Sequence, residues 1–332
     1  MEAALQRAFE RAGHRTLLFD DRRSARLVGE YLTQKRVLRA ARRFAPDFVF
    51  LSKCRRLELD VVQRVIAGVP NAMWYMDPPY HTLTHLPDIA HSLAVARMAS
   101  VFFVTGFAEE WRTHGTNAIF LPSAAAAEIV PVAPDRRYAS VAAFIGSGYD
   151  AGRAAFLEAV AARVDTRVYG PGWEAWRESL KWNGGRVEGV EFARVCSSAE
   201  FTLGALPAIA HGSTTYASNR MWITMLAGGL YVGPWAPGIE RMAVDGEHCV
   251  WYRQTEDCID RMLGLLAAPV QERRRIRASG EAFVRRHHTY DARLTNLIEG
   301  TPWVNPLDGS PAHASAEPRT GTSAPRVGHE RR

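Results

Sequence analysis

Short apolar runs alternate with segments of helical periodicity along most of this 332-residue chain. The runs are apolar on both faces, which is typical of parallel strands covered by helices on both sides of a sheet. The sequence predicts strands at 16–20, 47–51, 72–76, 100–104, 117–121, 141–145, 166–169, 201–203 and 230–232. Helices are expected between them, at 25–43 and 57–67 for example. This alternation predicts an α/β protein with two doubly wound, Rossmann-like domains whose ligand site lies in the cleft between them.

The order of these segments also predicts the domain boundaries. A Pro- and Ala-rich stretch at 122–134 has the composition of a linker, so we expect an N-terminal domain at 1–135 and a C-terminal domain at 136–286. Residues 303–332 contain four prolines and few large apolar residues, and we expect a disordered tail there. A helix at 3–12 precedes the first expected strand. Such domains usually open with a strand, so we expect that this one lacks its first strand or that the true reading frame, or an ancestral one, began upstream.

Composition excludes several protein classes. With 47% hydrophobic and 23% charged residues the chain is neither disordered, collagen-like nor fibrous. No apolar run approaches the ~18–20 residues of a membrane span, and the first residues lack the apolar core of a signal peptide, so we predict a cytoplasmic protein. The four cysteines show no CxxC spacing, which favours free thiols over a disulfide framework or a zinc site.

Charge is concentrated at the start of the chain. Residues 1–64 contain 15 lysines and arginines against 8 aspartates and glutamates, a net charge of +7, while the remaining residues carry a net charge of −1. Much of this basic surface can be solvated helix faces. The alternative is that the N-terminal domain meets an anionic partner: a phospholipid surface, a sugar-phosphate polymer or a nucleic acid.

Three loops after predicted strands have the composition of ligand sites. The first, Ile145–Arg153, contains Gly146, Ser147 and Gly148, but it matches neither the Walker nor the GxGxxG pattern. The second, Tyr169–Trp173, either admits a base or forms a stiff turn. The third begins at His211 and leads through Ser218 and Asn219 into a helix with Arg220 in its first turn. Arginine there opposes the helix dipole, so its position indicates a bound anion such as a diphosphate, with a solvated side chain as the alternative.

Together these motifs make the chain similar to the CgeB-like glycosyltransferases, a retaining, nucleotide-sugar-dependent branch of the group 1 type with the GT-B fold. In the C-terminal half the resemblance rests on Phe144–Ser147, Arg153, Val168–Gly170, Trp173, Gly189, Glu191, Ser218–Arg220, Leu226–Gly228, Gly238–Glu240, Gly246–Glu247, His288–Tyr290 and Arg293. A looser match in the N-terminal half comprises Pro46–Asp47, Pro70, Met73–Pro79, Gly115 and Leu121–Pro122.

The resemblance implies roles for particular residues. The helix that begins at Ser218–Arg220 would face the diphosphate of a UDP-, GDP- or dTDP-sugar, Arg153 would add a second positive charge, and Glu240 would approach the ribose or the sugar. The full expected donor-binding set is Gly146, Ser147, Arg153, Gly170, Trp173, His211, Ser218, Asn219, Arg220 and Glu240. The segment 287–302 would form a C-terminal helix that crosses back to the N-terminal domain.

The sequence also departs from the pattern of related retaining enzymes. They often carry two glutamates, one before this helix and one inside it, where this chain has Thr215 and Ile223. Either Glu240 compensates for the missing carboxylate, or the chain is a catalytically silent binding or scaffold subunit. Asp77 and His81, just past a predicted strand, are the candidate catalytic residues on the acceptor side.

Partners and cofactors follow from the same comparison of motifs. We expect a small-molecule or glycan acceptor, an anionic one included, and disfavour a nucleic acid because no nucleic-acid motif appears. No cofactor besides the nucleotide-sugar co-substrate is expected. We expect no metal site at His81, His85 and His91, because Pro87 interrupts the helical spacing and no HExxH pattern is present.

Overall fold

The first half of the chain folds around a four-stranded parallel sheet. The computed structural model describes residues 2–77, 89–205 and 218–311. The strand order is β1-β2-β3-β4, and every neighbouring pair is parallel. The elements of this N-terminal domain are α1 (Glu2–Arg11), α2 (Asp21–Val28), α3 (Glu30–Phe44), β1 (Val49–Leu51), α4 (Leu59–Ile66), β2 (Asn71–Tyr75), α5 (Ile89–Met98), β3 (Val101–Val104), α6 (Ala108–Thr113) and β4 (Ala118–Phe120).

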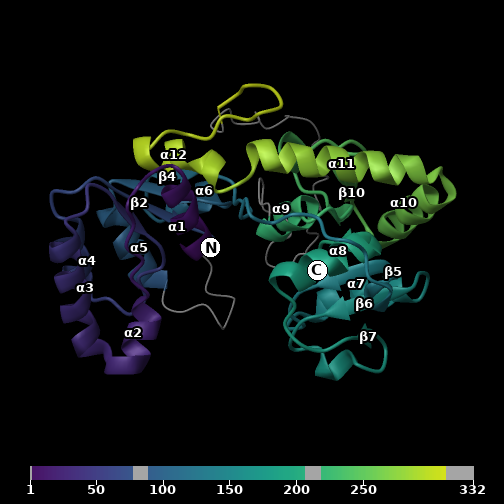
Figure 1. The fold of residues 1–332 in the computed structure, drawn as a ribbon, viewed down its shortest axis with the longest axis horizontal. Coiled ribbons are helices and arrows are strands. Elements are labelled where there is room, and N and C mark those ends of the chain that lie inside the picture. The colour runs from purple at the N-terminus through teal and green to yellow at the C-terminus, as the bar shows by residue number, and fades with distance from the viewer. Residues whose placement is uncertain (1, 78–88, 206–217, 312–332) are drawn as a thin grey trace, which may run out of the picture.

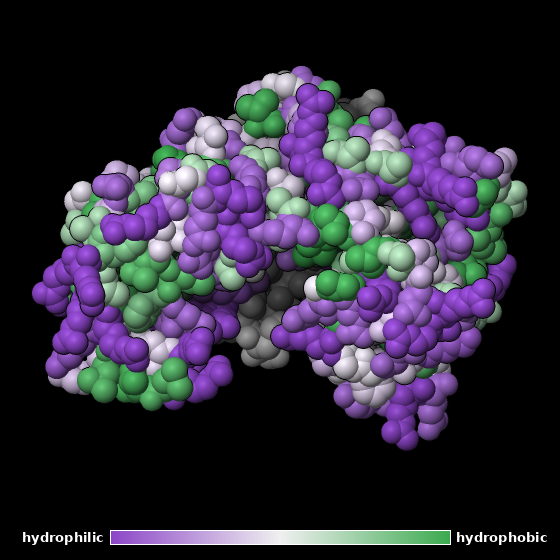
Figure 2. All heavy atoms as spheres, in the orientation of Figure 1, coloured by the Kyte–Doolittle hydropathy of each residue, from purple (hydrophilic) through white to green (hydrophobic). Residues whose placement is uncertain are grey.

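The second half contains a six-stranded parallel sheet with the order β10-β9-β8-β5-β6-β7. Its strands are β5 (Ser140–Ile145), β6 (Thr166–Tyr169), β7 (Lys181–Trp182), β8 (Ala199–Leu203), β9 (Tyr231–Pro234) and β10 (Val250–Tyr252). Its helices are α7 (Ala151–Ala161), α8 (Gly189–Ser198), α9 (Asn219–Leu226), α10 (Thr255–Ala267) and α11 (Val270–His287). The strand order reverses between β5 and β8, which is the point where such sheets bind ligands. The two sheets form separate lobes, and the surface is hollowed between them (Figures 1 and 2).

Eight of the nine predicted strands are confirmed, so the α/β class with two parallel-sheet domains holds. The strand predicted at 16–20 is wrong, because these residues form no strand and pair with none of the described strands. An apolar run forms a strand only where a neighbour satisfies its backbone, and here Leu17 and Leu18 are instead exposed. The helix predicted at 25–43 is divided into α2 and α3 by Gly29, whose φ of 80° is incompatible with a continuous helix.

Two segments pass between the domains, and both are packed. The predicted linker at 122–134 lies beside the segment that follows α11: the amide of Ala125 donates to the carbonyl of His288 at 2.9 Å, and the amide of Tyr290 donates to the carbonyl of Ala125 at 3.0 Å. After this crossing, α12 (Leu294–Glu299) returns to the N-terminal lobe (Figure 1). The two crossings therefore form one hydrogen-bonded junction.

Arg293 ties this junction together from inside. Its side chain is almost completely buried and donates to the carbonyls of Pro122 (3.0 Å), Ser123 (3.5 Å) and His287 (2.8 Å), and to Nδ1 of His288 (2.8 Å). Burial lowers the pKa of Arg293 to about 9, which still leaves the guanidinium charged at neutral pH. A buried charge needs partners around it, and these acceptors come from both crossings.

His288 connects the junction to the helix that begins at Arg220. Its ring is stacked on Trp222 of α9, with centroids 3.8 Å apart and an interplanar angle of 7°. Because Nδ1 accepts from Arg293, the proton of the neutral ring lies on Nε2, which has no hydrogen-bond partner among the described residues. Burial and the neighbouring Arg293 together lower the pKa of His288 well below its ordinary value of 6.5.

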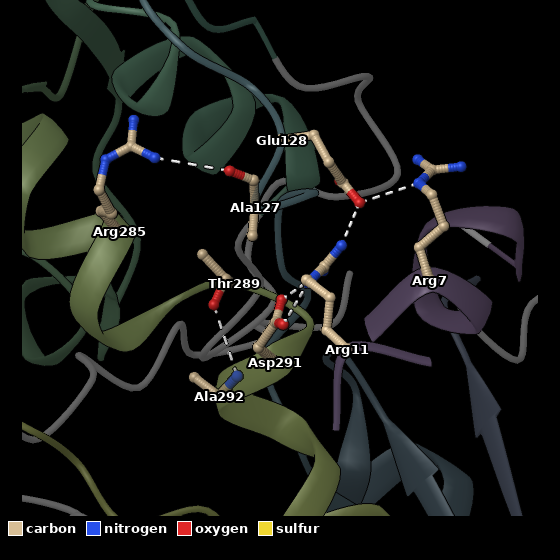
Figure 3. Close-up of polar contacts among 8 residues, drawn as sticks. All are labelled: Arg7, Arg11, Ala127, Glu128, Arg285, Thr289, Asp291 and Ala292. Carbon is tan, nitrogen blue, oxygen red and sulfur yellow. Dashed lines mark hydrogen bonds and ion pairs between the residues drawn. The ribbon is translucent and has the colours of Figure 1, made fainter. Parts of the chain in front are cut away.

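Ion pairs add an outer layer to the same junction. Glu128 lies between Arg7 and Arg11 of α1, and Arg11 also binds Asp291 at 2.7 Å (Figure 3). These charges raise the pKa of Arg11 and lower that of Glu128, in each case against the opposing effect of partial burial. The exposed pairs fix the position of α1 more than they stabilise the fold.

The chain stays ordered beyond the crossing. Residues 303–311 were expected to belong to the disordered tail, but Trp303 is buried and packs edge-on against Phe120 with ring centroids 6.0 Å apart. Asn305 is buried as well, and Val304 forms a bridge with Pro311. The burial of one tryptophan and one asparagine holds residues 303–311 against the domain, although the overall composition of the tail is typical of disorder.

In the described parts of the chain, no helix has both the length and the apolar character needed to cross a membrane.

The buried, neutral His288 makes the stability of the fold depend on pH. Because the pKa of His288 is lower in the folded chain than in the unfolded one, its contribution is complete above about pH 6.5 and is lost as the pH falls below that value. The variant His288→Asn keeps an acceptor for Arg293 but does not titrate. We expect urea unfolding to show a shallower loss of stability between about pH 7 and pH 5 for this variant than for the wild type. Equal slopes for the two proteins would contradict this account.

Candidate functional site

A pocket lies at the carboxyl ends of β5 and β6, next to the reversal of strand order in the second sheet. Its volume is about 220 Å³, and it opens to solvent. The first turn of α9 forms one side, and the loop before α8 forms another. The lining residues are Ile145, Gly146, Ser147, Gly170, Pro171, Arg186, Val187, Glu188, Phe192, Asn219, Arg220 and Ile223.

Glycines allow the loops around this pocket to approach one another. A Cβ atom on Gly146 would lie 2.8 Å from Nη2 of Arg220, and one on Gly148 would lie 2.4 Å from the carbonyl oxygen of Gly172. Gly170 has a φ of 121°, and its Cβ would lie 2.4 Å from the carbonyl oxygen of Gly146. These separations are shorter than any side chain tolerates, so the pocket requires glycine at these positions.

Arg220 is placed on the pocket wall by the start of α9. Ser218 is the N-cap residue, and its hydroxyl accepts from the amide of Arg220 at 3.4 Å. The guanidinium group lies over the ring of Phe144, 5.2 Å from its centroid. The N-terminus of α9 and a guanidinium group thus meet the glycine loop at one cavity, and this combination suits an anionic ligand.

Arg153, the second expected cation, is hydrogen-bonded to backbone carbonyls inside the domain. It is buried, its Nη1 donates to the carbonyl of Ser147 at 2.8 Å, and its Nε donates to the carbonyl of Ala205 at 3.2 Å. The side chain lies over the rings of Phe144 and Tyr149 and does not line the pocket. Arg153 therefore supports the glycine loop on the side that faces away from the pocket.

Trp173 and Glu240 also lie away from the pocket wall. Trp173 is fully buried, and its indole Nε1 donates to the carbonyl of Gly146 at 2.7 Å, so it supports the glycine loop. Glu240 is exposed in the 3₁₀ helix Ile239–Arg241 that follows β9, and its carboxylate accepts from the amide of Gly238 at 3.1 Å.

The sequence did not single out the loop Arg186–Glu188, although it forms a wall of the pocket. Arg186 Nη1 and a carboxylate oxygen of Glu188 are 3.4 Å apart, and both side chains are largely exposed. Sheet topology could have indicated this loop, because every loop that leads from a parallel strand into the following helix lies at the same edge of the sheet. Ile223 also lines the pocket, so the apolar residue at that position faces the ligand space.

In the N-terminal domain, Asp77 follows β2 and lies between two cations. Lys53 forms an ion pair with its carboxylate, and Arg55 Nη2 lies 3.6 Å from it. Cys54, between these two basic residues, adopts a left-handed backbone conformation with a φ of 48°, a strain that often marks functional sites. His81, His211 and Thr215 lie outside the described residues. Within the described ranges, no group of three or more His, Cys, Asp or Glu side chains is arranged to hold a metal ion.

Comparisons with known proteins identify this fold. A family model described as glycosyl transferase-like matches residues 153–299. Among solved structures, HepE of Anabaena in complex with UDP and glucose is similar, with a TM-score of 0.60, 12% identity, and coverage of 81% of this chain and 80% of that one. Sucrose-phosphate synthase of Thermosynechococcus elongatus has a TM-score of 0.57 and 11% identity, with coverage of 81% and 78%. No curated protein sequence gives a significant match. The chain thus has the predicted GT-B fold.

The close approach of the two glycine loops predicts a position-specific effect of alanine. We expect Gly148→Ala to lower the free energy of unfolding by about 2–4 kcal/mol, because its Cβ would lie 2.4 Å from a backbone oxygen and 2.5 Å from the Trp173 ring. The control is Gly152→Ala, two residues into α7, where the nearest atom is 3.4 Å away and the stability should rise by up to about 1 kcal/mol. Urea unfolding of both variants measures the difference, and equal effects would contradict it.

Proposed function

We propose that this protein is a glycosyltransferase that binds a nucleoside diphosphate sugar in the β5–β6 pocket and transfers the sugar to an acceptor hydroxyl. The observation that carries the proposal is the position of Arg220, which lines the pocket beside Gly146 and Ser147. The glycosyl transferase-like match over residues 153–299 supports the same reading. Further support comes from the similar HepE structures, which are complexes with UDP and glucose and with UDP-glucose. Membership of the CgeB-like family is part of this proposal.

Arg220 provides the central electrostatic step of the proposed reaction. As the bond between the anomeric carbon and the diphosphate oxygen breaks, negative charge develops on the leaving diphosphate. A fixed guanidinium group and the N-terminus of α9 stabilise that charge more in the transition state than in the ground state. Because these groups can neutralise the diphosphate, we propose that transfer does not require a metal ion. Retention of the anomeric configuration is proposed from the family resemblance, and NMR of the product anomer tests it.

Asp77 is proposed to contact the acceptor. Its carboxylate follows the carboxyl end of β2 and can accept a hydrogen bond from the sugar acceptor's hydroxyl group. The flanking Lys53 and Arg55 hold the carboxylate in place by ion pairs, which favours an orienting role. Their positive charge also suits an acceptor that carries an anionic group.

Glu188 is the carboxylate best placed to compensate for Ile223. Both residues line the pocket, whereas Glu240 does not. An isoleucine cannot accept hydrogen bonds from ribose hydroxyl groups, but a carboxylate on the opposite loop can. We therefore propose that Glu188 contacts the donor, with Arg186 beside it as a second cation.

A catalytically silent scaffold is the second candidate function, and the position of Ile223 on the pocket wall favours it. Under this alternative, Arg220→Ala leaves the binding of a partner protein unchanged. Under the main proposal, the same change abolishes transfer. The two functions therefore differ in the phenotype of a single variant.

Donor binding provides the direct test. We expect at least one of UDP, GDP and dTDP to raise the melting temperature by roughly 5 °C at about 100 times its Kd. Arg220→Ala should remove the shift, while Arg163→Ala, on an exposed helix end outside the pocket, should retain it. A folded wild type that responds to none of the three nucleotides would overturn the proposal.

Glu188 has its own test. We expect Glu188→Gln to weaken nucleotide binding about tenfold in calorimetry, because a hydrogen bond to a charged acceptor contributes about 1.5 kcal/mol or more. Glu178→Gln is the control, since Glu178 is exposed and lies outside the pocket lining. Unchanged affinity in Glu188→Gln would remove this residue from the site without affecting the role of Arg220.

A further inference from the structure

The helix pair α2–α3 buries polar residues and exposes apolar ones. Ser24 and Thr33 are buried against each other, and the Thr33 hydroxyl donates to that of Ser24 at 3.0 Å. Leu27, Tyr31 and Leu32, in contrast, are 68%, 69% and 48% exposed. Large apolar side chains are normally buried in preference to hydroxyl groups. This inverted arrangement indicates that the outer face of the pair is covered by a partner.

The exposed apolar residues are concentrated in this part of the N-terminal domain. Leu17 and Leu18, in the connection that leads into α2, are 51% and 45% exposed. Leu27, Tyr31 and Leu32 follow within 15 residues and define what we call the α2–α3 face. Figure 2 shows apolar surface at the α2 end of this lobe, bordered by hydrophilic side chains. Contiguous apolar patches of this kind mark interaction sites in soluble domains.

Basic residues surround the apolar ones on the same two helices. Each is exposed, and within the described parts of the chain none forms an ion pair with a carboxylate. They are Arg22, Arg23, Arg26, Lys35, Arg36 and Arg39. The ammonium group of Lys35 lies over the ring of Tyr31, 4.3 Å from its centroid. The nearby Glu30 is already paired with Arg56 at 2.9 Å, so it does not neutralise this cluster.

We propose that the α2–α3 face docks on the surface of an anionic lipid bilayer. Leu27, Tyr31 and Leu32 would enter the boundary between headgroups and acyl chains, and the basic residues would contact lipid phosphates. A second copy of this chain would bring like charges together. A nucleic acid would bind the arginines but leave the leucines in water. The combination of leucines with unpaired basic side chains is therefore best matched by a bilayer, and the inference does not depend on the donor chemistry.

Co-sedimentation with vesicles tests the proposal on the full chain. We expect the wild type to bind vesicles of equal parts phosphatidylglycerol and phosphatidylcholine at about 0.1 M salt, and to bind pure phosphatidylcholine vesicles at least about tenfold more weakly. The double variant Leu27→Ser/Leu32→Ser should lower the partition coefficient at least about tenfold. The triple variant Arg22→Gln/Arg23→Gln/Arg26→Gln should do the same and reduce the salt dependence.

Matched controls separate docking from general effects of substitution. Val130→Ser/Val304→Ser changes two exposed apolar residues elsewhere, and Arg64→Gln/Arg274→Gln/Arg286→Gln removes the same number of exposed charges. Both controls should bind anionic vesicles like the wild type. The proposal is overturned if the wild type ignores anionic vesicles at low salt, binds both vesicle types equally, or loses no binding in either α2–α3 variant. Self-association that disappears in the leucine variant would also overturn it, because the occupant would then be a second copy.

Discussion

The arrangement of the two lobes depends on the buried guanidinium group of Arg293. One side chain donates to carbonyls on both segments that pass between the domains, and no neutral side chain offers as many donors in a planar group. The charge is tolerated in the interior because each nitrogen of the guanidinium group donates a hydrogen bond to an acceptor. The apolar cluster around it includes Trp74 and Phe103 from the first sheet and Trp222 and Met225 from α9. The lobes consequently share one core across the junction.

Close packing of backbone determines the pocket in a similar way. The β5 and β6 loops touch through glycines, and Arg153 and Trp173 hold the outer side of the same loop by hydrogen bonds to its carbonyls. Residues behind the pocket are thus as well defined by the structure as the residues that line it. For this reason Arg153 and Trp173, whose positions in the sequence are typical of ligand contacts, support the glycine loop and do not line the pocket.

Much of the fold could be predicted from sequence because buried parallel strands leave a strong local pattern. Eight strands and the helix that carries Arg220 were recognisable in this way. The segment 16–20 has the same apolar pattern but no pairing partner, and pairing is a property of the whole sheet. The pocket was predicted in part: Gly146, Ser147, Gly170, Asn219 and Arg220 line it. Glu188 and Arg186 were not predicted, because charged residues before a helix are usually solvated. Only the sheet topology places this loop beside the pocket.

Helix α9 carries Arg220 and Trp222 only two residues apart, one on the pocket wall and the other stacked on His288 inside the shared core. Both residues lie in the first turn of α9, so the pocket wall and the shared core meet at a single helical turn. A shift of this turn would change the surroundings of the indole ring, on which its fluorescence emission depends. The tryptophan that joins the two lobes therefore lies directly beside the proposed nucleotide pocket.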